Sequence, residues 1–139
     1  MKHNWSIICQ ESIIDQETNR LSLINNLEQL NLPQASFGKD LPIPFEVISY
    51  FTEVETDKEK EIEQLIKILD PQNNQIKETK IKVRVPEKFS RFRLRNKIVG
   101  MPISTPGMYK FLLFIKVDNG KFNNIAELGV EVLLKNKLV

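Results

Sequence analysis

The segment GMYKFLLFIKV, residues 107–117, followed by Asp118-Asn119-Gly120, decides the fold class of this chain. Every second residue from Tyr109 to Val117 is large and apolar, so an extended chain carries an unbroken hydrophobic row on one face. Asp-Asn-Gly supplies residues that tolerate positive φ in a tight reversal. The segment therefore predicts a β-strand that enters a hairpin.

The same alternation recurs along most of the 139 residues and predicts an all-β protein. Residues 33–44 hold three prolines and a glycine, which interrupt regular structure and predict a connection that crosses between two sheets. The expected architecture is a single-domain antiparallel β-sandwich of about eight strands over residues 1–139. The expected strands are residues 3–10, 21–27, 45–54, 62–69, 76–85, 91–98, 107–117 and 128–134.

Individual strands carry further expectations. Trp5, Ile7 and Cys9 form an apolar row that we expect to face the core, which makes Cys9 an inert buried thiol. Residues 45–54 are apolar on both faces, as is typical of a central strand. Two stretches also fit helical spacing, and we favour strand for both. The residues with helical spacing are Leu23, Ile24, Leu27 and Leu30, and then Ile62, Leu65, Ile66 and Leu69.

Composition limits the compartment and the partners. The net charge of +2 is too small to imply a polyanionic partner unless the basic residues are clustered. The single cysteine cannot form an intramolecular disulfide, and the sequence shows neither a signal peptide nor an apolar run long enough to span a membrane. We therefore expect a cytoplasmic protein with no membrane partner.

The residue types disfavour catalysis and metal binding. His3 is the only histidine, so a zinc site built from His and Cys would have at most two ligands. An extended strand separates His3 from Cys9 by about 20 Å, too far for a catalytic dyad. No Gly-x-Ser-x-Gly turn or phosphate-cradling glycine loop occurs. The expectation is a non-enzymatic protein with no catalytic residue, no metal and no cofactor.

Residues 80–97 contain eight basic side chains and a single acid, Glu87. Alternation places seven of these basic residues, all except Lys88, on one face of each of two strands, and a shared sheet would display them as one cationic surface near Phe89. Such a surface binds nucleic acid or another polyanion. The alternative is a solvated face lying against the acidic residues 53–63. The candidate anion-binding residues are Lys80, Lys82, Arg84, Arg91, Arg93, Arg95 and Lys97, with Lys88 among them in sequence.

Leu112 and Phe114 are a second candidate site, because they point away from the row that contains Phe111. Together with Ile48 and Tyr50 they would form an apolar patch for a homodimer or another protein partner. The alternative is that a loop covers them.

The opening Cys9-Gln10-Glu11 is followed by a D-x-x-T-x-x-x-S-L-I-N pattern at residues 15–25, and a G-x-Y-x-F strand begins at Gly107. These landmarks resemble those of a bacterial family of small all-β proteins of unassigned activity. The resemblance covers most of the chain and implies an all-β domain without supplying a catalytic residue. The function expected is a binding or structural module with its contact surface on exposed sheet faces. Polyanion binding through residues 80–97 is the alternative.

Overall fold

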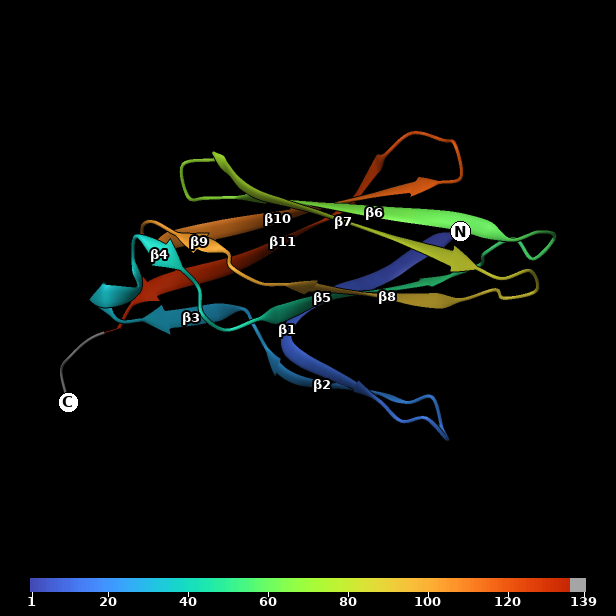
Figure 1. Ribbon diagram of the computed structural model, residues 1–139, viewed down its shortest axis with the longest axis horizontal. Coiled ribbons are helices and arrows are strands. Elements are labelled where there is room, and N and C mark those ends of the chain that lie inside the picture. Colours follow the sequence, from blue (N-terminus) through green and yellow to red (C-terminus); the bar gives the residue numbers. More distant parts are fainter. Residues whose placement is uncertain (136–139) are drawn as a thin grey trace.

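A computed structural model describes residues 1–135 and confirms the all-β prediction. Two sheets pack face to face as a β-sandwich (Figure 1). Sheet A has the strand order β2 (Leu21–Asn26), β1 (Lys2–Ile14), β5 (Phe45–Thr52), β8 (Phe92–Ile98). Sheet B has the order β3 (Gln29–Leu32), β11 (Asn123–Leu134), β10 (Gly107–Val117), β6 (Lys60–Leu69), β7 (Gln75–Val85).

All eight expected strands occur, and three short ones were not expected. These are β3, which pairs in parallel with β11, and the pair β4 (Lys39–Asp40) and β9 (Pro102–Ile103). Strand β11 begins at Asn123 rather than at residue 128. The stretch 62–69 lies in β6 and is strand, as favoured.

Strand β10 lies at the centre of sheet B, between β11 and β6. Its alternate side chains Tyr109, Phe111, Leu113 and Ile115 are all buried, which confirms the hydrophobic row. Asp118 has a φ of 50° in the hairpin that follows. Its carboxylate accepts a hydrogen bond from the Glu61 backbone N–H at 2.9 Å, so the turn is also tied to the start of β6.

The segment 33–44 connects β3 of sheet B with β5 of sheet A, as its prolines predicted. It contains a short 3-10 helix, Gln34–Ser36, and strand β4. Leu41 of this connection is buried in the larger of two apolar clusters between the sheets, where Phe45 and Phe111 meet edge to face with ring centroids 5.8 Å apart. The connection therefore closes one end of the core.

The expected orientation of β1 is wrong. Ile8, not Ile7, belongs to the core between the sheets. The register pairs Trp5 with Tyr50 and Ile7 with Ile48, on the outer face of sheet A. Cys9 is nevertheless buried, and burial raises the pKa of its thiol, so the group stays neutral. The outer face is apolar here because the β1–β2 hairpin bends back beside it.

A hydrogen-bonded series of polar side chains, His3, Ser6, Ser49 and Gln64, lies inside the sandwich near the N-terminus. His3 Nε2 and Ser6 Oγ lie 2.7 Å apart, as do the hydroxyls of Ser6 and Ser49. Gln64 Nε2 of sheet B donates to Ser49 Oγ at 3.1 Å, so the series links both sheets. The His3 ring also packs against Phe51, with centroids 5.3 Å apart.

Stability should fall as pH decreases below about 6.5, because burial lowers the pKa of His3 in the folded state. Below that pH, His3 is protonated more fully in the unfolded chain than in the folded chain, which favours unfolding. Above that pH, His3 is neutral in both states. Urea unfolding at pH 7.5, 6.5 and 5.5 measures the change. The His3→Asn variant should show a flatter profile over this range, and an equally steep profile would contradict the assignment.

No helix in the described part of the chain is long and apolar enough to cross a membrane.

Candidate anion-binding groove

A groove of about 1270 Å³ lies at the end of the sandwich where β7 leads into β8. Its floor is the outer face of sheet A, with Trp5 of β1, Tyr50 of β5, and Arg93 and Arg95 of β8. One wall is the β1–β2 hairpin, which leaves the body of the sandwich at the lower right of Figure 1. The other wall is formed by the end of β7, the β7–β8 connection and the first residue of β8, over residues 83–92 without Glu87. We call this the arginine groove.

Strand register places the floor residues side by side. Trp5 is paired with Tyr50, and Tyr50 is paired with Arg93, so the three side chains form a row across β1, β5 and β8. The rings of Trp5 and Tyr50 have centroids 5.7 Å apart and are tilted by 38°. Both side chains are only partly buried, so the floor offers an aromatic surface next to a guanidinium group.

The hairpin wall is held by local hydrogen bonds. The Asp15 carboxylate accepts from the backbone N–H groups of Glu17 and Thr18, each at 2.9 Å, and these bonds lower the pKa of Asp15. Arg93 donates to the Asn19 backbone oxygen at 2.9 Å and to its side-chain oxygen at 3.3 Å. The hairpin tip is therefore fixed to β8 across the groove.

The base of the hairpin is held by Arg95. Its Nε donates to Ser12 Oγ at 2.8 Å, and a terminal nitrogen donates to the Ser12 backbone oxygen at 3.1 Å. Ser12 Oγ in turn donates to Glu46, whose carboxylate lies 3.9 Å from Arg95. Two of the N–H donors of Arg95 are thus already bonded within the protein, and its charge is partly balanced by Glu46.

The charged side chains that line the groove are all positive. All five arginines of the chain line it, together with Lys88, and its lining contains no Asp or Glu. Arg84 has a carboxylate partner, Glu59 at 3.6 Å, and this pair is mostly exposed. Among residues 1–135, Arg20, Lys88, Arg91 and Arg93 lie in no ion pair within 4.0 Å. A chain of net charge +2 therefore gathers its unpaired arginines in one concave site.

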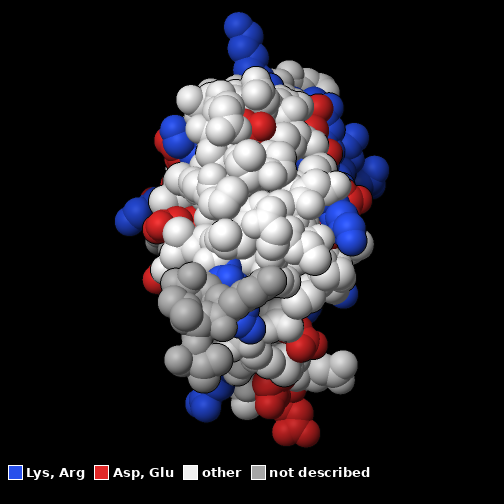
Figure 2. All heavy atoms as spheres, turned by 90° about the vertical axis from the view of Figure 1, so that its left-hand side faces the viewer, with Lys and Arg blue, Asp and Glu red and all other residues white. Residues whose placement is uncertain are grey.

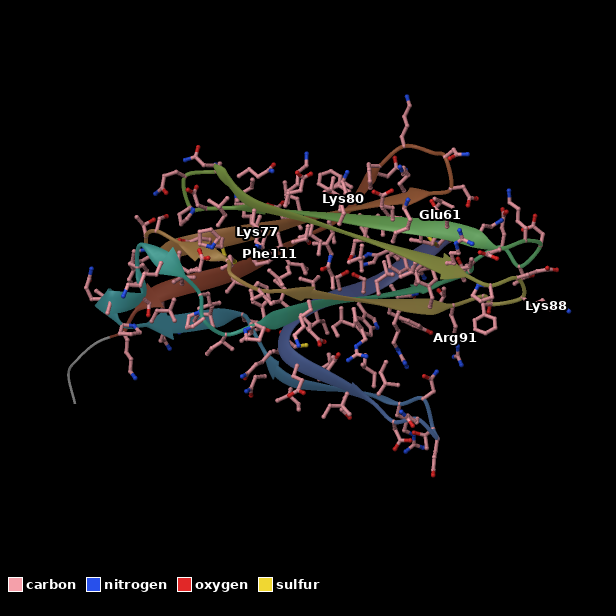
Figure 3. All side chains as sticks on the ribbon, viewed as in Figure 1. Glu61, Lys77, Lys80, Lys88, Arg91 and Phe111 are labelled. Carbon is pink, nitrogen blue, oxygen red and sulfur yellow. The ribbon has the colours of Figure 1, made fainter. Side chains whose placement is uncertain are left out.

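The two basic strands do not share a sheet, so the condition for one continuous cationic sheet surface is not met. Strand β7 is at the edge of sheet B and β8 at the edge of sheet A. Lys80 and Lys82 lie outside the arginine groove: Lys82 pairs with Glu61 of β6 at 3.5 Å, and Lys80 Nζ lies over the Phe122 ring, 5.7 Å from its centroid. Figure 3 shows Lys80 on the upper side of the sandwich, and Lys88 and Arg91 at its right-hand end.

The structure thus divides the candidate residues. Arg84, Arg91, Arg93 and Arg95 line the arginine groove, whereas Lys80, Lys82 and Lys97 do not. Three residues that lie far from the basic cluster in sequence join it in space: Trp5, Arg20 and Tyr50. The alternative, a solvated basic face lying against acidic residues, describes the outer side of β7, where Lys82 and Arg84 pair with Glu61 and Glu59. It does not explain the basic residues of the arginine groove.

The four-residue apolar patch does not form. Ile48 and Tyr50 belong to sheet A, and Leu112 and Phe114 to sheet B. Ile48 is also fully buried. Leu112 and Phe114 are partly buried, and Lys67 Nζ lies over the Phe114 ring at 5.4 Å from its centroid. Leu112 and Phe114 alone stay a candidate contact for a protein partner or a homodimer.

The opposite end of the sandwich differs in charge from the groove. Figure 2 looks at the end that carries β4 and β9 and shows mostly uncharged side chains there, with charged groups around the rim. Among residues 1–135, no group of three or more His, Cys, Asp or Glu is placed to hold a metal ion.

No family model matches the chain, and no curated protein matches it. The resemblance to a bacterial family of small all-β proteins stays a prediction. The arginine groove itself is therefore the main guide to function among the described residues.

Proposed function

We propose that the chain is a non-enzymatic binding module that holds an extended polyanion in the arginine groove. The observation that supports this most directly is the lining: five arginines and Lys88, without a carboxylate. A guanidinium group presents a planar fork of N–H donors that fits phosphate and carboxylate oxygens in pairs. Several such groups in one concave site favour a ligand with repeated negative charges.

The size of the groove favours an extended ligand over a small molecule. Pockets for small ligands usually measure about 300–1,000 Å³ and enclose most of the ligand. The arginine groove, at about 1270 Å³, exceeds that range. Its walls come from a hairpin and a connection rather than from a closed cavity.

The lining also favours binding over catalysis. It contains no His, Cys, Asp or Glu, the side chains that most often serve as nucleophile or general acid and base. A cytoplasmic location belongs to the same proposal, because the single cysteine is a free, buried thiol and the fold is made without a disulfide.

The test is binding of fluorescently labelled inorganic polyphosphate at 50 mM salt, a concentration at which phosphate contacts are strong. The Arg20→Gln/Arg91→Gln variant should weaken binding by at least about tenfold, because two unpaired guanidinium groups are lost. Both residues are exposed and outside ion pairs in the described chain, so the midpoint of thermal unfolding should not change.

The matched control is Lys80→Gln/Lys97→Gln. It removes the same charge from two exposed residues outside the groove. Its effect should stay under about threefold, since general attraction at a distance is screened by salt. Equal losses in the two double variants, or no polyphosphate binding by the unmodified protein, would overturn the proposal.

A further inference from the structure

The arginine groove contains aromatic side chains that a charge-only site does not need. Trp5, the only tryptophan of the chain, lies on its floor beside Tyr50. Phe89 lies in the wall formed by the β7–β8 connection and is 58% exposed, whereas the ring of Phe92 stacks on Phe51 of the core. One exposed aromatic ring and two partly buried ones, next to unpaired arginines, form a combination that binds unpaired bases together with their phosphates.

We infer that the ligand of the arginine groove is single-stranded nucleic acid, with bases stacked on Trp5 and Tyr50 and phosphates held by the arginines. This inference rests on the proposed function and makes it more specific. A polyphosphate chain carries the charge but has no planar group that stacks on the rings. DNA and RNA share the chemistry in question, and stacking is tolerant of base identity, so we expect no strong sequence preference.

The arrangement of strands fits a single strand running along β8. Arg91 directly precedes β8 and Arg93 lies on it, and neither is in an ion pair among residues 1–135; two residues of extended chain separate them by about 7 Å. This interval is close to the separation of successive phosphates in an extended single strand. Tyr50 and Trp5 lie beside Arg93 on the two neighbouring strands, so a base stacked there points away from β8 while its phosphate lies over it.

The walls argue against a duplex. Bases in a double helix are stacked on one another and expose only their edges, so they have no free face for Trp5 and Tyr50. The β1–β2 hairpin is also fastened to β8 by the bonds from Arg93 to Asn19, so it stands as a wall beside the aromatic floor. A flexible single strand reaches this floor more readily than a rigid rod.

The sole tryptophan gives a direct test on the unmodified protein. Titration with an oligothymidine or an oligouridine of about 15 nucleotides should quench Trp5 fluorescence, because a base stacks on the indole ring. Inorganic polyphosphate should bind without comparable quenching, and a hairpin duplex of the same length should bind at least about tenfold more weakly than the single strands. The two oligonucleotides separate DNA from RNA as the source.

A variant pair gives the second test. Trp5→Leu/Tyr50→Leu should weaken single-strand binding by about tenfold to a hundredfold, while polyphosphate affinity changes less than about threefold. Phe114→Leu, a partly buried aromatic residue on sheet B outside the groove, is the matched control and should change neither affinity.

The outcomes separate the two proposals. Polyphosphate binding that depends on Arg20 and Arg91, without a preference for single strands or quenching of Trp5, overturns this inference and leaves the proposed function standing. Duplex binding as tight as single-strand binding also overturns it. If the Arg20→Gln/Arg91→Gln variant binds both polyphosphate and the oligonucleotides as tightly as the unmodified protein does, both proposals are overturned.

Discussion

Replacing Phe111 with alanine should lower the free energy of unfolding by about 3–5 kcal/mol. Phe111 is only 1% exposed and lies in the central strand of sheet B. Its ring meets Phe45 of sheet A edge to face, with centroids 5.8 Å apart. Truncation opens a cavity between two sheets. The backbone hydrogen bonds of each sheet keep the strands from moving in to fill it, so few of the lost van der Waals contacts are replaced. Urea or guanidinium unfolding, with the slope checked for a two-state transition, measures the loss.

Phe114 on the same strand is the control. It lies on the opposite face of β10, is partly exposed, and contacts Lys67 rather than the core. Phe114→Ala should cost about 1 kcal/mol or less, since part of its surface already meets water. A cost equal to that of Phe111→Ala would contradict the assignment of the two faces of β10.

The strands of this fold could be predicted from sequence because most of them are long enough to show alternation. The strands β3, β4 and β9 were missed because two to four residues are too few to show a period. Residues 62–69 fitted both a helix and a strand, and the pairing of β6 with β10 and β7 makes them a strand. That pairing is a long-range interaction which local periodicity does not contain.

Which face of a strand meets the core was harder to predict. On β1, both Ile7 and Ile8 are apolar, because one face meets the core and the other lies beside the bent hairpin. The row with the larger apolar side chains, Trp5 and Ile7, was therefore assigned to the core, although it lies on the outer face of sheet A. Those residues are apolar and aromatic because they build the floor of the arginine groove and its surroundings, where Trp5 packs on Tyr50.

The site was predicted only in part for the same reason. Arg84, Arg91, Arg93 and Arg95 were found as a cluster because they are close in sequence. Arg20 and Trp5 join them through the order β2-β1-β5-β8, which a single sequence does not reveal. Lys80 and Lys82 carry the same charge but lie on β7 outside the groove, next to Phe122 and Glu61 respectively, so composition alone did not separate them from the groove residues.

Affinity for polyphosphate or a single-stranded oligonucleotide should fall about 50-fold between 50 and 200 mM monovalent salt if four phosphates are neutralised. The number four follows from the cations of the groove that lack a carboxylate partner among residues 1–135: Arg20, Lys88, Arg91 and Arg93. Each contact on a single strand releases about 0.7 counterion, so the slope of log affinity against log salt should be about −2.8.

Removing two of these four cations should halve that slope. Arg20→Gln/Arg91→Gln should then lose only about sevenfold over the same range of salt, while Lys80→Gln/Lys97→Gln keeps nearly the full dependence. The comparison separates local contacts from the field of the whole protein, because both double variants have the same net charge and differ only in where it was removed. A slope that falls equally in both variants would mean that the ligand senses overall charge rather than the arginine groove. A full slope in Arg20→Gln/Arg91→Gln would place the phosphates on another surface.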